Sequence, residues 1–408
     1  MNEKDELQVI YFGCPGTGKS YTIKSLLKSN GFSEKGYKNY LEKGEFKNER
    51  TPSNYASIIK RTKELNVLPN GKDSIFDISD INELCKIEEK LNKEKEIEDF
   101  SKTDSEKATI RNVKSTIIHY KKYLQSLLEN EFRTVFYPDY DYDSFVGSYK
   151  PSMNGEKIVY GYVPQVFTKA YVYAWNHLNE PTYLVIEEIN RGNCAQIFGD
   201  LFQLLDRGDD NYSEYPIDST SDLSSYLKDY LKISEGINVK NIEAIKSGKK
   251  LVLPPNFHIF ATMNTSDQSL FPMDSAFKRR WSWKYVPISA QKFQKDKQWK
   301  IKIDEDFSHE WGDFVEKINV KIAEITHSED KQIGYFFCKA NGDSCIDKET
   351  FVSKVVFYLW NDIFKDYGDN LLFKNKEGNL MFHDFFGDNG EIKTDIVEAF
   401  INNVFREK

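Results

Sequence analysis

With 408 residues, 56 lysines and arginines and 64 aspartates and glutamates, the chain carries a net charge of −8 and is long enough for two or three domains of about 150 residues. The acidic balance excludes a general polyanion-binding surface, so any DNA contact must be a local patch or a property of an assembly. Five cysteines without a C-x-x-C pair argue against a zinc site and for a reducing compartment. The N-terminus is charged and no apolar run reaches about 18 residues, so we expect a cytoplasmic protein with no membrane segment.

A complete phosphate-binding loop, G-x-x-x-x-G-K-[ST], occupies residues 13–20. A β-rich run precedes it and a helical pattern follows it, which disfavours the alternative of a glycine-rich turn with a surface lysine. In such a loop backbone N–H groups surround the β-phosphate, Lys19 reaches the β- and γ-phosphates, and the Ser20 hydroxyl binds Mg²⁺. The predicted nucleotide-binding residues are Gly13, Pro15, Gly16, Thr17, Gly18, Lys19, Ser20 and Tyr21.

Residues 36–131 are polar and charge-dense, and we interpret them as a largely helical insertion between the first two strands of a core. Two segments carry apolar residues at helical spacing: Leu84, Ile87 and Leu91, then Ile110, Val113, Ile117, Tyr120, Leu124 and Leu127. Two roles remain open for this insertion. It is either a module that recognises substrate or partner, or a solvated helical pair that packs on the core.

Core strands resume at Arg133 and are followed by an aromatic stretch, Tyr137, Tyr140, Tyr142, Phe145 and Tyr149. Aromatic side chains with lysines nearby can stack on the bases of single-stranded nucleic acid. Pro138 and the alternating aspartates favour the other interpretation, in which these residues form a turn and pack in the core.

A second apolar strand, residues 181–186, ends in Glu187 and Glu188. Two acids at the carboxyl end of a buried strand are typical of the Walker B motif, which faces the nucleotide phosphates. Glu187 is the predicted Mg²⁺ ligand, directly or through water, and Glu188 is predicted to orient and polarise the attacking water. The alternative is an acidic strand end that faces solvent, which the phosphate-binding loop upstream disfavours.

A third apolar strand, residues 257–262, leads to Asn264, and a polar residue at the tip of a strand beside Glu187 is well placed to sense the γ-phosphate. Arg279 and Arg280 follow at the end of a short predicted helix. In ring-forming ATPases this position faces the neighbouring subunit, where an arginine can complete the transition-state charge. The predicted catalytic residues are therefore Glu188, Asn264, Arg279 and Arg280, with Arg279 preferred as the trans-acting group and Arg280 as a support for the interface or fold.

Three motifs in this order resemble the McrB family, the nucleotide-hydrolysing AAA+ subunit of methylcytosine-directed restriction systems. They are Glu187-Glu188-Ile189-Asn190-Arg191-Gly192-Asn193, Met263-Asn264-Thr265-Ser266-Asp267-Gln268-Ser269 and Phe277-Lys278-Arg279-Arg280-Trp281. Residues 136–147, 332–337 and 355–360 are also similar to that family. Two residues depart from its pattern, because Glu187 stands where the family usually has aspartate and Gln268 where it often has arginine.

The resemblance implies a Mg²⁺-dependent motor that hydrolyses GTP or ATP, forms a homo-oligomeric ring of six subunits, and drives a separate McrC-like endonuclease. DNA would then be contacted through the assembly. A domain that binds modified DNA commonly precedes this motor, and we expect none within these 408 residues. In AAA+ proteins related to McrB an insert such as residues 212–251 faces the pore, so this segment, with its helical pattern and Lys246–Lys250 cluster, is predicted to contact substrate.

The predicted fold is α/β: an AAA+ P-loop core in residues 1–287, with a parallel sheet flanked by helices and insertions at 36–131 and 212–251. Residues 288–408 are predicted to form a mainly α-helical lid, in which Lys331 is a candidate to approach the γ-phosphate. One apolar helical face in the lid is formed by Trp311, Phe314, Val315, Ile318, Ile322 and Ile325.

Two other functions remain open at the level of sequence. One is a MoxR-like ATPase that remodels protein complexes, and the other is a scaffold that binds nucleotide but hardly hydrolyses it. Glu188 and Arg279 argue against the scaffold. The motifs around Asn190 and Asn264 favour the McrB-like function over the MoxR-like one.

Overall fold

The structure is a computed structural model that describes residues 6–31, 37, 75, 78, 81–97, 104–154, 157–237, 239–266, 271–290, 299–305, 307–365, 367, 372–375 and 378–406. Gln268 and most of residues 36–80, which belong to the predicted first insertion, lie outside these ranges. Within the described ranges, no helix combines the length and apolar character that crossing a bilayer requires.

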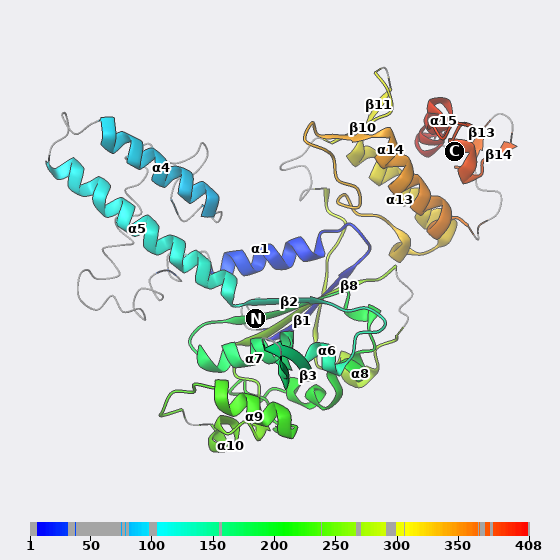
Figure 1. Ribbon diagram of the computed structural model, residues 1–408. Coiled ribbons are helices and arrows are strands. Elements are labelled where there is room, and N and C mark those ends of the chain that lie inside the picture. The colour runs from blue at the N-terminus through cyan, green and yellow to red at the C-terminus, as the bar shows by residue number, and fades with distance from the viewer. Residues whose placement is uncertain are drawn as a thin grey trace.

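A five-stranded parallel sheet forms the centre of the molecule, with the strand order β2-β5-β8-β1-β9 (Figure 1). Its strands are β1 (Gln8–Gly13), β2 (Glu131–Val135), β5 (Thr182–Glu187), β8 (Phe257–Asn264) and β9 (Ser282–Tyr285). Because all five run the same way, the segments that follow β1, β5 and β8 meet at one edge of the sheet. This arrangement confirms the predicted α/β P-loop fold.

Two apolar layers cover the sheet, because successive side chains of a strand point to opposite faces. On one face Val9 and Tyr11 of β1 pack with Ile23 and Leu27 of α1 (Lys19–Gly31). On the other face Ile10 joins a larger cluster that includes side chains of three helices. These are α6 (Tyr142–Phe145), α7 (Val166–Asn176) and α8 (Cys194–Phe198).

The aromatic stretch after β2 is divided between this core and the surface. Phe136, Tyr140 and Phe145 are buried in the larger cluster, as core packing predicts, whereas Tyr137 and Tyr149 are exposed. Phe136 and Tyr140 stack with ring centroids 5.1 Å apart.

The apolar spacing of Cys194, Ile197, Phe198, Leu201 and Leu205 is typical of a single helix, but the structure divides this segment into two elements. α8 ends at Phe198, and a 3-10 helix, Gly199–Leu205, follows it. Gly199 has a φ of +52° and a ψ of −126°, a conformation that favours glycine and interrupts the α-helical path. A Cβ there would lie 3.2 Å from the ring of Tyr142. The apolar side chains on both sides of the break are still buried.

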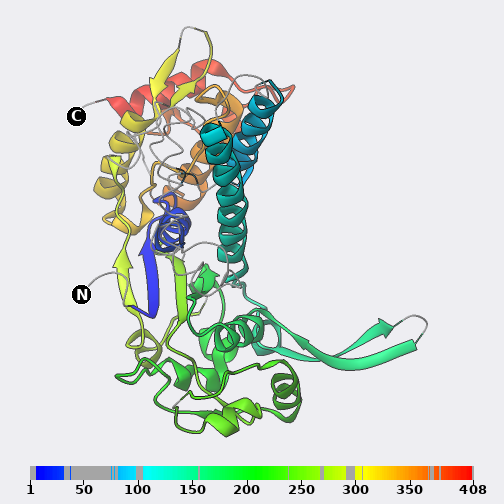
Figure 2. The same ribbon diagram turned by 90° about the vertical axis from the view of Figure 1, so that its left-hand side faces the viewer.

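Helices α4 (Ile81–Ile97) and α5 (Asp104–Glu129) lie side by side and project from the sheet (Figures 1 and 2). As their apolar spacing predicts, they share a buried seam formed by Leu84, Ile87, Leu91, Val113, Ile117, Tyr120 and Leu124. The side chains of Ile110 and Leu127, which belong to the same predicted pattern, lie outside the described ones. Lys121 also donates a 2.8 Å hydrogen bond to Glu88 across the pair. The packed seam explains why these two segments are helical.

Strands β3 (Gly147–Asn154) and β4 (Lys157–Pro164) form a long antiparallel hairpin that extends away from the sheet (Figure 2). The hairpin carries exposed apolar side chains, among them Tyr149 and Tyr160, whose rings stack. Its base is held by Tyr162, which donates a 2.9 Å hydrogen bond to the carbonyl of Val146 and packs against Tyr226 of α9.

The second predicted insertion packs on the same core. It contains β6 (Ile217–Asp218), α9 (Ser221–Tyr230), α10 (Ile242–Lys246) and β7 (Lys250–Leu251). Two lysines of the cluster at its end pair with acids, Lys246 with Glu243 at 3.6 Å and Lys250 with Asp218 at 2.7 Å. These ion pairs reduce the positive charge that the cluster offers to an anionic ligand.

The C-terminal region has its own apolar core, formed by residues between Trp299 and Val404. Its longest helix is α13 (Trp311–Thr326), whose buried face agrees with the predicted one, and α15 (Thr394–Phe405) packs beside it. A helical run begins with α14 (Lys348–Thr350) and continues through two π-helical segments, Phe351–Val356 and Leu359–Ile363. The small strands are β10 (Lys300–Lys302), β11 (Ser308–Glu310), β12 (Cys345–Asp347), β13 (Lys374–Asn375) and β14 (Gly378–Asn379).

Buried polar groups hold the sheet at the edge opposite the phosphate-binding loop. Arg207 donates to Gln8 Oε1 at 3.1 Å and to the carbonyls of Leu253 and Phe257 at 3.0 and 2.9 Å. Burial lowers the pKa of Arg207 to about 9. Gln8 in turn donates to the carbonyl of Arg280 at 3.0 Å, which fixes the chain just before β9 to the start of β1.

We expect acid to destabilise the protein through His258, at the start of β8. Burial lowers the pKa of His258 from 6.5 to about 4, so the folded state keeps the ring neutral while the unfolded state takes up a proton near pH 6.5. Stability is therefore lost as the pH falls below 6.5, by about 2 kcal/mol between pH 7 and pH 5. Urea unfolding measures the free energy of unfolding at both pH values. We expect His258→Gln to lose less stability between pH 7 and pH 5 than the unsubstituted protein does. The exposed control His383→Gln should lose as much as the unsubstituted protein.

Candidate active site

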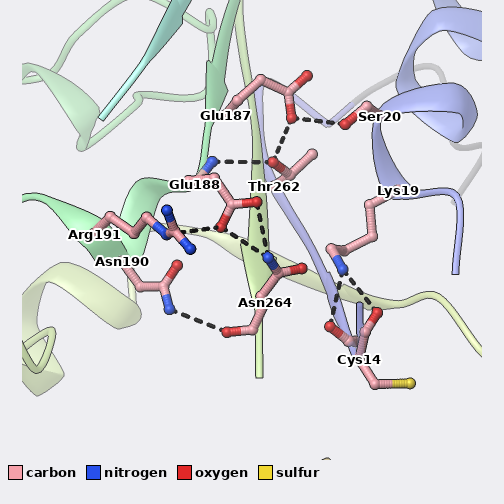
Figure 3. A network of polar contacts seen from close by, with 10 residues as sticks. Cys14, Lys19, Ser20, Glu187, Glu188, Asn190, Arg191, Thr262 and Asn264 are labelled. Atoms are coloured by element: carbon pink, nitrogen blue, oxygen red, sulfur yellow. Dashed lines mark hydrogen bonds and ion pairs between the residues drawn. The ribbon is translucent and has the colours of Figure 1, made fainter. Parts of the chain in front are cut away.

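The phosphate-binding loop joins β1 to α1 and has the backbone of an anion-binding loop. Gly16 and Gly18 have φ values of +80° and +85°, which side chains with a Cβ rarely adopt. The Lys19 ammonium donates to the carbonyls of Gly13 and Cys14 at 3.0 and 2.9 Å (Figure 3). The loop thus presents a buried cation beside its own carbonyls, where a nucleotide phosphate would compete for it.

Two other loop positions have different environments. Burial raises the pKa of the Cys14 thiol to about 11, so it stays protonated and is not a nucleophile at neutral pH. Tyr21, in the first turn of α1, is 70% exposed, and the structure gives it no contact with the loop beyond its place in the helix.

Glu187, the last residue of β5, has its carboxylate surrounded by donors. Glu187 Oε2 accepts from the hydroxyls of Ser20 at 2.8 Å and Thr262 at 2.5 Å (Figure 3). Glu187 Oε1 pairs with the guanidinium of Arg133 on the neighbouring strand β2. Arg133 also contacts Glu131 at 2.7 Å and so lies between two carboxylates.

Ser20 and Glu187 fit the chemistry of a Mg²⁺ site. They are the residues predicted as metal ligands, and their oxygen atoms lie 2.8 Å apart. A hydroxyl and a carboxylate are hard oxygen donors, and Mg²⁺ in nucleotide sites is held by one or two such groups together with phosphate oxygens and water. The longer side chain of glutamate therefore still brings its carboxylate to the serine hydroxyl.

Glu188 lies just beyond β5 in a left-handed conformation, with φ of 55° and ψ of 47°. Asn264 Nδ2 donates to both of its carboxylate oxygens, at 2.8 and 3.0 Å, and Arg191 Nε lies 3.8 Å from Oε2 (Figure 3). The backbone N–H of Glu188 donates to the hydroxyl of Thr262 at 3.1 Å, and the Asn190 side-chain amide donates to the Asn264 carbonyl at 3.0 Å. The second acid is thus aimed along β8, away from the Ser20–Glu187 pair.

The two arginines after α11 (Ser275–Lys278) have different surroundings. Arg280 forms a 2.5 Å ion pair with Asp206, and its guanidinium lies 3.9 Å from the centre of the Phe202 ring. Arg279 is exposed and pairs with no carboxylate in the described part of the chain. Arg280 is therefore engaged inside the fold, which disfavours a direct catalytic part for it and leaves Arg279 as the available guanidinium.

The contacts that the structure shows for the Lys331 ammonium are with Tyr367. The ammonium lies 3.4 Å from the hydroxyl of Tyr367 and 4.9 Å from the centre of that ring. The expectation that Lys331 approaches the γ-phosphate receives no support from these contacts.

The sequence analysis assigns no role in the site to three side chains that the structure places there: Thr262, Arg133 and Arg191. A signal for Thr262 was present, because it lies two residues before Asn264 and the two therefore share a face of the same strand. Arg191 is one turn from Glu188. Arg133 has no local signal, since its contact with Glu187 depends on the register between β2 and β5.

Comparisons with known proteins indicate the family of the chain. A protein family described as AAA domain (dynein-related subfamily) matches residues 114–281, which include Glu187, Asn264 and Arg279 but not the phosphate-binding loop.

Two curated proteins are similar over part of the chain. The type II restriction enzyme BsuMI component YdiS of Bacillus subtilis (strain 168) is 34% identical over 258 residues, which are 57% of this chain and 70% of that protein. The type IV methyl-directed restriction enzyme EcoKMcrB subunit of Escherichia coli (strain K12) is 26% identical over 153 residues, 36% of this chain and 26% of that subunit.

Proposed function

Because this chain belongs to the McrB-like family of AAA+ nucleoside triphosphatases, we propose that it is the motor of a restriction system, which hydrolyses GTP or ATP to power a McrC-like endonuclease. The observation that carries the proposal is the meeting of Lys19, Ser20, Glu187, Glu188 and Asn264 at one edge of the sheet. Both curated relatives are parts of restriction enzymes, which supports restriction over protein remodelling.

Each residue has a part in the proposed hydrolysis. The backbone amides of the loop and Lys19 bind the phosphates. Ser20 and Glu187 would hold Mg²⁺, which when bound would supply positive charge beside the phosphate oxygens. Glu188 orients the attacking water and accepts its proton. Asn264 binds the carboxylate of Glu188 and releases it when the γ-phosphate offers the amide another acceptor.

The position of Arg279 supports a ring. β9 pairs with β1 in parallel and Arg280 is bonded to Gln8, so the arginines lie at the start of β1. From Gln8 to Gly13 the strand rises by roughly 16 Å, at about 3.3 Å per residue. This separation exceeds the reach of an arginine side chain, so Arg279 would act on the nucleotide of a neighbouring subunit in a homo-oligomer, proposed to be a hexamer.

The restriction role is tested in cells. The chain is expressed alone and together with the product of the neighbouring gene, which we expect to carry a nuclease motif. Transformation by methylated and unmethylated plasmids is then compared. We expect the pair to reduce the uptake of modified DNA and Lys19→Ala to abolish that effect. A neighbouring gene without a nuclease motif, or plasmid uptake that the co-expressed pair leaves unchanged, would contradict the restriction role and favour protein remodelling.

The nucleotide is tested by competition. By family membership we expect GTP to be hydrolysed at least as well as ATP. Steady-state hydrolysis of each nucleotide is measured with the other in excess. Complete suppression of GTP hydrolysis by ATP, without the reverse effect, would assign the motor to ATP.

We expect Asn264→Ala to lower the turnover number by about 10²-fold while changing nucleotide affinity little, since the amide controls where Glu188 lies and adds only one hydrogen bond to the many that bind the phosphates. Single-turnover hydrolysis and equilibrium binding of a non-hydrolysable analogue measure the two effects separately. An unchanged turnover number would show that the Asn264–Glu188 contact has no part in catalysis.

A further inference from the structure

The lid region touches the phosphate-binding loop through main-chain hydrogen bonds. The N–H of Gly334 donates to the carbonyl of Pro15 at 2.8 Å, and the N–H of Phe336 donates to the carbonyl of Gly16 at 2.9 Å. Residues 334–336 and the loop are more than 300 positions apart in the sequence. Two consecutive carbonyls of the loop are thus held by one short segment of the lid.

These bonds determine where two loop amides point. In a trans peptide unit the C=O and N–H groups point in opposite directions, and the described chain contains no cis peptide bond. The carbonyl of Pro15 shares its peptide unit with the N–H of Gly16, and the carbonyl of Gly16 shares its unit with the N–H of Thr17. Since both carbonyls face the lid, both N–H groups face the opposite side, into the loop that surrounds a phosphate.

The contact is too close for a side chain on either side. A Cβ on Gly334 would lie 2.3 Å from the carbonyl carbon and oxygen of Gly16 and 2.5 Å from the nitrogen of Thr17. A Cβ on Gly16 would lie 2.4 Å from the nitrogen of Phe337. The phosphate-loop motif does not itself require glycine at position 16, so this glycine reflects its positive φ and its contact with the lid.

Side chains of α13 hold the lid segment in place through hydrogen bonds. The buried side chain of Asn319, on α13, accepts from the N–H of Ile333 at 2.9 Å and donates to its carbonyl at 2.8 Å. The indole N–H of Trp311 donates to the carbonyl of Tyr335 at 2.7 Å. The segment therefore moves with α13, and a movement of the lid changes its contact with the loop.

We propose that residues 334–336 are a positioning element of the nucleotide site, which orients the Gly16 and Thr17 amides toward the phosphates and so couples phosphate affinity to the position of the lid. The element affects the binding of the nucleotide's phosphate groups and not the binding of its nucleobase. It requires only that the chain binds a nucleotide, and it is independent of the restriction role and of the trans-acting arginine.

The test is Gly334→Ala, with Gly342→Ala as the matched control, because a Cβ at Gly342 meets nothing within 4 Å. Calorimetric titration measures the Kd of non-hydrolysable GTP and ATP analogues and of inorganic tripolyphosphate. We expect Gly334→Ala to raise all three Kd values by about tenfold, as loss of two orienting hydrogen bonds would, and Gly342→Ala to match the unsubstituted protein. Unchanged Kd values, or weakening of one nucleotide without tripolyphosphate, would overturn the proposal.

Hydrogen exchange on the unsubstituted protein gives a second measurement that does not depend on the variant's folding. Without nucleotide, we expect the amides of Gly334 and Phe336 to exchange far more slowly than that of exposed Gly342. Exchange of these two amides at the rate of an unstructured peptide would contradict the proposed contact. The titration and the exchange measurement do not involve the restriction assay. A negative restriction assay would therefore contradict the proposed function and leave this proposal to be decided by these two measurements.

Discussion

Glu188→Gln is expected to reduce the turnover number by about 10²- to 10⁴-fold, the range attributed to a positioned general base, while the affinity for nucleotide stays nearly unchanged. Glutamine keeps the size of the side chain and an oxygen that can accept from Asn264, but it cannot take a proton from water. Because the effect arises only as the bond breaks, it belongs to the turnover number and not to ground-state binding.

Hydrolysis in a single turnover and binding of a labelled nucleotide measure these two quantities. Lys19→Ala is the contrasting variant, since it removes a buried cation from the phosphate site and should abolish binding itself. Glu349→Gln, at an exposed acid in α14, is the matched control and should behave as the unsubstituted protein. Equal hydrolysis by Glu188→Gln and the unsubstituted protein would remove Glu188 from this part.

Arg279→Ala is expected to reduce turnover by about 10³-fold or more, the size attributed to an arginine that completes transition-state charge. Nucleotide binding and the fold should be nearly unaffected, because the side chain is exposed at the end of α11. Hydrolysis rate, nucleotide affinity and thermal midpoint of the purified variant measure the three properties.

Arg280→Ala separates this catalytic effect from a structural one. Arg280 pairs with Asp206 and stacks on Phe202, so its removal leaves a partly buried acid without its partner and should lower the thermal midpoint. If Arg279→Ala lost stability and kept its turnover, the two arginines would have the reverse of the parts proposed here.

The central part of the fold could be predicted because it depends on local patterns. β-rich runs that end in glycines or acids predict parallel strands with functional residues at their ends, and β1, β5 and β8 have that arrangement. Glu187 and Ser20 were both predicted as metal ligands from their motifs, and the structure brings their oxygens together.

Other features depend on contacts between distant residues, which no local pattern encodes. Arg133 reaches Glu187 only through strand register, and Gly334 reaches the phosphate-binding loop only after its own segment has packed on α13 of the C-terminal region. Gly199 illustrates a different limit, because the apolar spacing continues across it while its positive φ ends the α-helix. Periodicity reports which side chains are buried and does not report the backbone path between them.

The claim that the active site is shared between subunits is tested most directly by mixing Arg279→Ala and Glu188→Gln proteins, each inactive alone. In mixed rings, some junctions place an intact Glu188 opposite an intact Arg279. With random mixing at equal concentrations these junctions are about one quarter of the total, so we expect about a quarter of the unsubstituted rate. A mixture that stays inactive although the two proteins co-assemble, or a dilute monomer that hydrolyses at the full rate, would contradict a shared site.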